Sequence, residues 1–371
     1  MPQHNEEKGL KSFLQNQHAA GLAGELAAWL EVPSPQNYRR FAIADMSMLD
    51  TKMLARMERH TSLGIQILET SRYAAYEELG PRLIPLDRLP AEKMQSFLST
   101  SDGVPALSFV ELLASEGIPQ LQSLIWLAEA EIADGMQMYC RYTDTRILPV
   151  LLDTLTEDQT AMIGGTIRRW AWFNREGALS QKNFAATKAV NDVPLPPLSF
   201  DDQQFSSLMQ AAEADLIFSM LRQSSPEIIP ETTPFDIHRR LLSLLEAGRE
   251  RGVIDAPDQL QFVAIAWSSS ETFYQLPCLA QSWENIRNQQ GRFSEVLKTW
   301  DDSIWEQIDA LKPGSLEAWK PGSLEAIENT HENLFQYLEN HIGAPATPRF
   351  FHGACRVRFE FHASASRQHS S

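Results

Sequence analysis

Three charged residues at 141–146 are the strongest candidates for chemistry in this chain. Arg141, Asp144 and Arg146 fall between a segment that alternates like a strand and a segment with helical periodicity. A carboxylate flanked by two guanidinium groups can bind a charged ligand, or it can hold a strand-to-helix junction through charge-assisted hydrogen bonds. Asp144 is also placed to cap the helix predicted over residues 146–155. We favour the structural clamp, because ion-pair networks in proteins are often structural.

A second cluster, RRWAWF at 168–173, combines arginine with aromatic residues. Its composition predicts a strand, and strand alternation places Arg168, Trp170 and Trp172 on one face and Arg169 and Phe173 on the other. One interpretation is a buried face backed by a solvated one. The other is a protein-binding surface, because Trp and Arg dominate interface hot spots. The pattern favours neither interpretation over the other.

Signatures of catalysis and of metal binding are missing from the sequence. It has no G-x-S-x-G, no Walker A motif and no C-x-x-C pair, and HENLF at 331–335 does not fit H-E-x-x-H. We therefore predict no catalytic residue, no metal and no cofactor. The alternative function is an α/β enzyme with a helical lid. A cleft with a carboxylate of strongly shifted pKa near Asp45 or Asp144 would support that alternative.

The formal net charge is −16, from 32 Lys and Arg against 48 Asp and Glu. A surplus of this size repels a phosphate backbone, so nucleic acid is not the expected partner. The first residues, MPQHNEEKGLKSFLQ, are polar and charged, unlike a signal peptide. No apolar stretch is long enough for a membrane span. The protein is therefore expected in the cytoplasm, without membrane attachment.

Strands and helices alternate along the first half of the chain. Residues 1–36 are predicted to contain an N-terminal helix, and residues 37–180 to form an α/β domain whose mixed sheet is covered by helices. The predicted strands span 38–46, 62–69, 82–86, 106–110, 136–141 and 167–173. The predicted helices of this domain span 49–60, 91–98, 118–133 and 146–155.

The second half of the chain has a helical period. The proline-containing segment 181–200 is predicted to be a linker, and residues 201–342 an all-α domain. The tandem repeat KPGSLEAW and KPGSLEAI at 312–327 has too few copies for a repeat architecture. The tail, residues 343–371, is predicted to be flexible.

Four segments of the first half, taken in order, resemble one known family. They are YRRFAIAD, LGPRLIPL, RYTDTRILPVLLDTLT and MIGGTIRRW. Together they are similar to the adaptor and chaperone family of bacterial type VI secretion systems, over about residues 38–175. Asp45 ends the family's first-strand motif, Gly80 and Pro81 occupy its strand-entry motif, and Thr145 replaces the proline of its junction motif.

The resemblance implies a cytoplasmic, non-enzymatic adaptor. Such a protein would bind the N-terminal region of a toxin effector and help load it onto the tip of a VgrG spike. Its expected partners are therefore the effector and the spike protein, with no nucleic acid and no membrane. By position, Arg141, Asp144 and Arg146 occupy the family's junction motif.

Overall fold

The computed structural model describes residues 13–61, 64–76, 80–88, 91–186 and 195–312. The chain divides into two compact units between Ala212 and Glu213, inside helix α7 (Asp202–Ser224). We call residues 15–212 the α/β unit. We call residues 213–312, with residues 13 and 14, the helical unit.

An antiparallel sheet is the centre of the α/β unit. Its strands lie in the order β2-β3-β1-β4-β8-β9, and β5 pairs with the end of β4. The central strand β4 is hydrogen-bonded to β1 on one side and β8 on the other. The strands are β1 (Tyr38–Asp45), β2 (Ile65–Gln66), β3 (Pro81–Pro85), β4 (Leu107–Ser115), β5 (Ile118–Pro119), β8 (Ile167–Phe173) and β9 (Leu179–Asn183).

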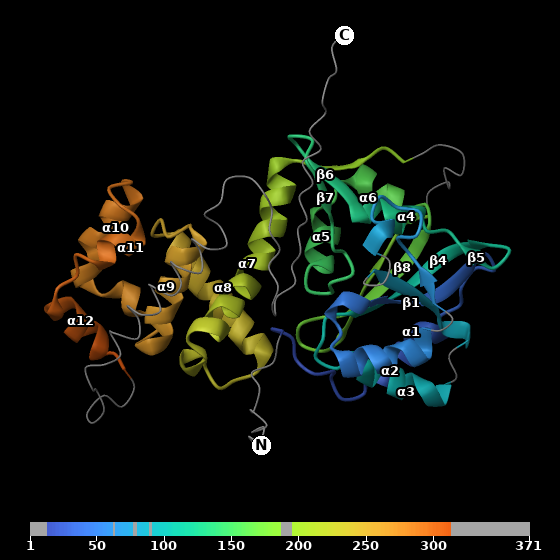
Figure 1. Cartoon of the computed structure of the whole chain (residues 1–371), viewed down its shortest axis with the longest axis horizontal. Helices are drawn as coiled ribbons and strands as arrows, with labels where there is room; N and C mark the ends of the chain where they lie inside the picture. The colour runs from blue at the N-terminus through green and yellow to red at the C-terminus, as the bar shows by residue number, and fades with distance from the viewer. Residues whose placement is uncertain (1–12, 62–63, 77–79, 89–90, 187–194, 313–371) are drawn as a thin grey trace, which may run out of the picture. The chain divides into compact units, whose positions relative to one another are not determined.

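Helices cover both faces of this sheet (Figure 1). One face carries α1 (Leu22–Glu31), α2 (Thr51–Thr61) and α3 (Ala91–Leu98), and the other carries α4 (Gln122–Ala128), α5 (Leu148–Thr154) and α6 (Glu157–Gly164). Strand β1 serves both cores, because successive side chains point to opposite faces. Phe41 and Ile43 pack with α4–α6, whereas Ala42 and Ala44 pack with α1–α3.

A small second sheet joins distant segments of the α/β unit. It contains β6 (Glu129–Ile132), β7 (Gln137–Tyr139) and β10 (Leu198–Phe200), and β6 pairs antiparallel with β7 but parallel with β10. Leu198 and Phe200 are buried, which anchors β10 in the core. The predicted linker segment 181–200 therefore begins in β9 and ends in β10.

The single helix predicted over residues 118–133 is wrong. The segment forms β5, α4 and β6 in succession. Pro119 lies in β5, and the charged residues Glu129 and Glu131 alternate with Ala130 and Ile132 in β6. This period of two is the pattern of a strand, and the apolar run between the two strands is only long enough for a short helix.

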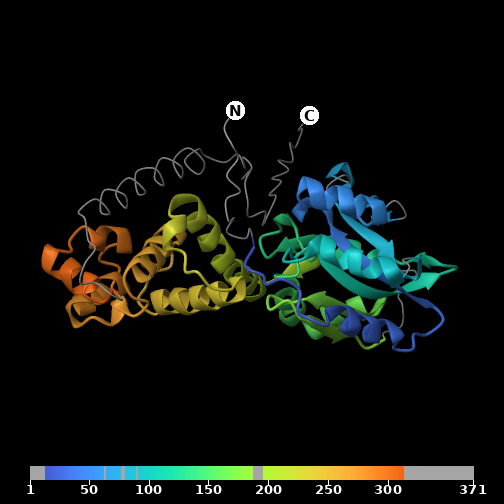
Figure 2. The same cartoon turned by 90° about the horizontal axis from the view of Figure 1, so that it is seen from below.

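The helical unit packs around an aromatic core, drawn from below in yellow to orange in Figure 2. Its described residues contain the second half of α7 and α8–α12, with no strand among them. The rings of Phe262, Phe273, Trp283, Phe293 and Trp300 contact one another. The helices are α8 (Pro234–Arg249), α9 (Ala256–Ser268), α10 (Ala280–Arg287), α11 (Phe293–Leu297) and α12 (Asp302–Asp309).

Short 3₁₀ segments connect several of these elements. They are η1 (Met46–Met48), η2 (Ala74–Tyr76), η3 (Leu86–Arg88), η4 (Ser99–Ser101), η5 (Pro226–Ile228), η6 (Phe273–Gln275) and η7 (Pro277–Leu279).

The predicted fold class is confirmed: sheets covered by helices are followed by a helical region. The first part of the predicted N-terminal segment, residues 1–12, lies outside the described residues, as do residues 313–342 and the tail 343–371. No helix within the described residues combines the length and the apolar character that a membrane span needs.

Candidate functional site: buried ion pairs and the groove beside β5

Arg141 pairs with Asp45, a residue 96 positions earlier in the chain. Asp45 ends β1 inside the α/β unit, and Arg141 follows β7. The guanidinium donates from Nε to Asp45 Oδ2 at 3.0 Å and from a terminal nitrogen to Oδ1 at 3.2 Å. The hydroxyls of Ser47 and Thr143 also donate to this carboxylate, each at 2.7 Å. The result is a bidentate, buried ion pair with further donors on both oxygens.

The surroundings of Asp45 favour its charged form. Burial opposes its ionisation, but the Arg141 guanidinium and the hydrogen bonds from Arg141, Ser47 and Thr143 outweigh this effect and hold its pKa below the usual value. A general base or acid near neutral pH instead needs a pKa close to the working pH and access to substrate. Asp45 has neither property, because its pKa is lowered and its side chain is only 2% exposed.

Asp144 and Arg146 form a second pair beside the first. Asp144 Oδ1 accepts from the backbone N–H and the Nε of Arg146, both at 3.0 Å, and Oδ2 accepts from a terminal guanidinium nitrogen at 2.6 Å. Both side chains are 1% exposed. Arg146 thus bonds Asp144 directly, while Arg141 also feels the charge of Asp144, which raises its pKa.

The predicted role of Asp144 as a helix cap is wrong. Helix α5 begins at Leu148 with Ile147 as its N-cap. Asp144 supports this turn through its backbone carbonyl, which accepts from the N–H groups of Ile147 and Leu148. Next to it, Thr145 donates its N–H to the carbonyl of Pro105 at 3.1 Å, a bond that a proline at this position could not make.

Glu111, which the sequence analysis did not single out, holds the arginines of β8. It is fully buried in the central strand β4, where it accepts from Arg169 Nε and from Arg168 at 3.1 and 3.2 Å. Burial opposes its ionisation, but hydrogen bonds from Ser34 and Arg169 and the charges of both arginines lower its pKa overall. A glutamate inside the apolar strand sequence LSFVELLAS was the available signal, because a buried carboxylate needs a partner.

A shift in register explains why both arginines reach one carboxylate. Glu111 lies opposite Arg169, but the next residue, Leu112, lies opposite Ile167, which leaves Arg168 as the extra residue of a bulge. The prediction that Arg168 shares a face with Trp170 and Trp172 is therefore wrong.

The tryptophans of β8 lie in the interior of the α/β unit. Trp170 is fully buried, donates Nε1–H to Ser108 Oγ at 3.1 Å and contacts the ring of Tyr142 edge-on. Trp172 is buried in the same core. The guanidinium of Arg169 lies 4.6 Å from the ring centroid of Trp29 in α1, a cation–π geometry. These side chains join β8 to β4 and to α1.

Gly80 and Pro81 lie at the entry to β3, beside the first ion pair. Pro81 is the first strand residue and lies directly opposite Asp45 in the antiparallel register. Its carbonyl accepts from the N–H of Ile67. A proline is compatible with the first position of a strand, where its missing N–H breaks no ladder bond.

Reactive or metal-binding groups do not gather in the parts of the chain that the structure describes. No set of three His, Cys, Asp or Glu side chains comes together there in a way that could hold a metal ion. Burial raises the pKa of the Cys140 thiol to about 12, so this cysteine carries almost no thiolate at neutral pH.

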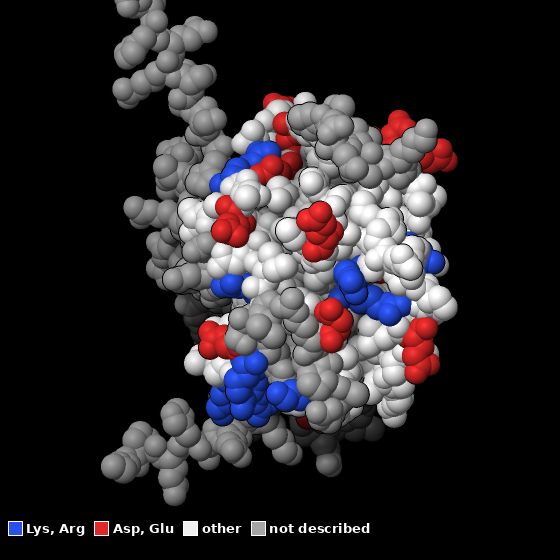
Figure 3. All heavy atoms as spheres, turned by 90° about the vertical axis from the view of Figure 1, so that its right-hand side faces the viewer, with Lys and Arg blue, Asp and Glu red and all other residues white. Residues whose placement is uncertain are grey.

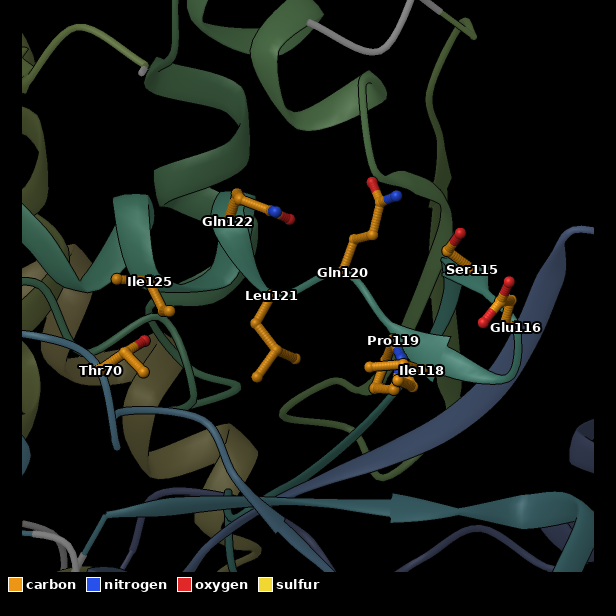
Figure 4. A pocket seen from close by; sticks show the side chains of 9 residues that line it. All are labelled: Thr70, Ser115, Glu116, Ile118, Pro119, Gln120, Leu121, Gln122 and Ile125. Atoms are coloured by element: carbon orange, nitrogen blue, oxygen red, sulfur yellow. The ribbon is translucent and has the colours of Figure 1, made fainter. Parts of the chain in front are cut away.

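A surface groove of about 490 Å³ lies between β5, the start of α4 and the loop at Thr70 (Figure 4). Leu121 points into the space between Thr70 and the β5 residues Ile118 and Pro119. Ile125 adds a further apolar side chain, and the rim is polar: Ser115, Glu116, Gln120 and Gln122. The groove can hold an apolar side chain, but its lining contains no nucleophile–base pair.

The hairpin that carries Ile118 is held by a tight turn. Glu116 and Gly117 have φ values of 51° and 84°, and Ser115 lies opposite Ile118 across the turn. Two successive residues with positive φ are typical of a two-residue type I′ turn. This turn presents Ile118 to solvent at 70% exposure, although large apolar side chains usually gain free energy from burial.

Comparison with known proteins gives one match. Residues 40–162 match the family model described as a domain of unknown function, DUF4123. This domain is known in type VI secretion effector-loading adaptors. No curated protein and no solved structure matches the chain. The matched segment contains the ion pairs Arg141–Asp45 and Arg146–Asp144, the strand entry at Gly80 and Pro81, and the groove beside β5. Arg168, Trp170 and Trp172 lie beyond it.

Proposed function

We propose that this protein is a non-enzymatic, cytoplasmic adaptor that binds a toxin effector of a type VI secretion system and helps load it onto the VgrG spike. The observation that carries the proposal is the match of residues 40–162 to a domain known in such adaptors. Its strand-to-helix junction and strand entry are the same segments whose sequences resemble the adaptor family.

The chemistry of the buried charges supports binding over catalysis. Asp45, Glu111 and Asp144 are enclosed carboxylates whose oxygens accept from arginine donors. All three are buried, so a substrate does not reach their oxygens, as it must reach those of a general acid or base. The pKa values of Asp45 and Glu111 are lowered, whereas a catalytic carboxyl acting as an acid or base near pH 7 needs a raised one.

We place the cargo contact in the groove beside β5, with an apolar side chain of the effector's N-terminal region as its occupant. Ile118, Leu121 and Ile125 supply an apolar lining, and a rim of polar residues surrounds it. Apolar anchors inside a polar rim are the usual anatomy of a protein–protein contact. Pro119 in β5 removes a backbone donor, so the groove suits side-chain docking better than addition of a strand.

The test is co-purification with the toxin effector encoded by the neighbouring gene. The wild-type chain is expected to retain the effector. Ile118→Asp is expected to weaken the complex by about tenfold or more, about 1.4 kcal/mol, because a charge enters an apolar contact. Binding affinity is measured by calorimetry on the purified proteins.

A matched control comes from the helical unit. Ile254 is 69% exposed, almost the same as Ile118, so Ile254→Asp makes the same chemical change on a similarly open surface. It is expected to leave the affinity within about twofold of wild type. Equal losses in both variants would contradict the groove assignment. Failure of the folded wild-type chain to retain the effector would contradict the adaptor function itself.

A further inference from the structure

Helix α2 presents a stripe of positive charge on the α/β unit. Lys52, Arg56 and Arg59 are all exposed. They are spaced by four and three residues, which places them one above another on a single face of a helix. The helix packs on the unit through a different side, which carries the buried Met57. Glu58 projects about 120° away from the stripe, by the 100° rotation per residue of an α-helix.

The three charges of the stripe find no carboxylate partner within the described residues. Acids outnumber bases by 48 to 32 in this chain, and several basic side chains elsewhere on its surface do take acidic partners. The described examples include Arg72–Glu129, Lys182–Asp153, Arg239–Asp236, Arg240–Glu271, Arg249–Glu213 and Lys312–Asp309. Lys52, Arg56 and Arg59 make no ion pair with any described side chain.

The stripe also opposes the electrostatics of its own helix. Like charges spaced by three or four residues repel one another along a helix face. Lys52 lies in the first turn, where the positive end of the helix dipole disfavours a cation. The nearby carboxylate of Asp50 accepts a hydrogen bond from the N–H of Met53 and makes no ion pair with Lys52. Helix stability therefore does not explain this arrangement.

On the face shown in Figure 3, Lys and Arg side chains form several groups, the largest near the lower edge. Lys93 of α3 is also exposed and has no described carboxylate partner. Acidic side chains are scattered over the rest of this face. A local positive field on an acidic molecule attracts an anionic group of limited size.

We propose that the basic stripe formed by Lys52, Arg56 and Arg59 docks an acidic segment of a partner protein. The proposal rests on the adaptor function, which requires contacts with other polypeptides. Charge complementarity identifies the occupant as acidic. The net charge of −16 selects a short peptide segment over a nucleic acid, because a long phosphate backbone would also meet the acidic remainder of the surface.

Direct binding of a probe tests the stripe without knowledge of the natural partner. The probe is a fluorescently labelled poly-L-glutamate peptide, and the readout is fluorescence anisotropy with the full chain. Wild type is expected to bind at low ionic strength and to lose most of the signal at about 200 mM salt, where the Debye length is shorter than about 8 Å. The variant K52E/R56E is expected to bind at least about tenfold more weakly.

The control variant is R287E/K298E in the helical unit. Both residues are exposed and neither has a described carboxylate partner, so the change in net charge is the same as in K52E/R56E. This control is expected to bind the probe within about twofold of wild type, allowing for the shared change in net charge. Equal losses in the two variants would overturn the proposal, as would a wild-type chain that does not bind the peptide.

Stability separates a binding role from a structural one. Because Lys52 opposes the helix dipole, K52E/R56E is expected to have a melting temperature no lower than that of wild type. A lowered melting temperature in parallel with the lost binding would show that the stripe supports the fold, and would overturn the proposal. Tighter binding of duplex DNA than of the peptide by wild type would also overturn it.

The adaptor function and the stripe can fail separately. If the neighbouring effector co-purifies with wild type but the peptide does not bind, the adaptor function stands and the stripe is wrong. If the peptide binds through the stripe but neither the effector nor the spike protein is retained, the stripe stands as a surface for acidic peptides and the adaptor function is wrong.

Discussion

At the residue scale, Asp45 and Glu111 show how this chain keeps charge inside its core. Each carboxylate lies on a strand of the main sheet and accepts from arginines on another element. A buried charge is tolerated only when it is paired and hydrogen-bonded, and removal of one partner leaves the other uncompensated. These pairs therefore tie β1 to the segment after β7, and β4 to β8.

Arg141→Met tests this role directly. The substitution keeps an apolar stem but leaves Asp45 buried without its guanidinium, so the free energy of unfolding is expected to fall by about 3–5 kcal/mol. Arg39→Met, at an exposed arginine of β1, is the control and is expected to change stability by about 0.5 kcal/mol or less. Urea unfolding followed by tryptophan fluorescence measures both. A loss in R141M no larger than in the control would contradict the assigned role.

Spacing along the sequence identified the charged residues but not all of their partners. The local pair Asp144–Arg146 lies within reach along the chain, so a cluster of three charges suggested it. Arg141 instead reaches Asp45, because β1 and the segment after β7 meet only once the sheet has formed. Glu111 escaped notice for the same reason: its partners are 57 and 58 residues away.

At the scale of elements, patterns with a strong period were predictable and irregular ones were not. The β-branched and aromatic runs of β1 and β8 predicted both strands. The bulge at Arg168 was not predictable, because an extra residue in one strand is defined only against its neighbour. The run at 118–133 was misread because an apolar composition does not distinguish a buried helix from short strands flanking a short helix.

Two helical glycines provide a matched test of packing between elements. Gly24 in α1 has open space where a Cβ would be, so Gly24→Ala is expected to raise the free energy of unfolding by about 0.5–1 kcal/mol through lower entropy of the unfolded chain. Gly164 ends α6, and a Cβ there would lie 2.3 Å from the carbonyl oxygen of Ala185. Gly164→Ala is therefore expected to lower stability by at least about 1 kcal/mol.

Chemical denaturation of both variants gives the sign of each change. The substitution is the same in the two cases, so helix propensity alone predicts stabilisation in both. Stabilisation by Gly164→Ala would show that residues 184–186 do not pack against α6 as closely as the structure has them.

At the scale of the whole molecule, the sequence pattern changes from alternating strands and helices to a pure helical period, and this change predicted the fold class. It did not predict that residues 181–183 and 198–200 would pair as strands, because β9 and β10 take their partners from β8 and β6. Each half also has a core of its own. Aliphatic side chains and several aromatic rings, three of them tryptophans, fill one side of the sheet in the α/β unit, and a cluster of contacting aromatic rings lies in the core of the helical unit.

Separate cores predict separate unfolding transitions in the full chain. Arg141→Met is expected to lower the transition of the α/β unit alone. Phe262→Ala removes a ring from the aromatic core, so it is expected to lower the free energy of unfolding of the helical unit by about 3–5 kcal/mol. Differential scanning calorimetry of the wild type and the two variants measures both effects. If each variant instead shifts one common transition, the two cores unfold as a single cooperative unit, and a substitution in either core would then weaken every binding surface of the protein at once.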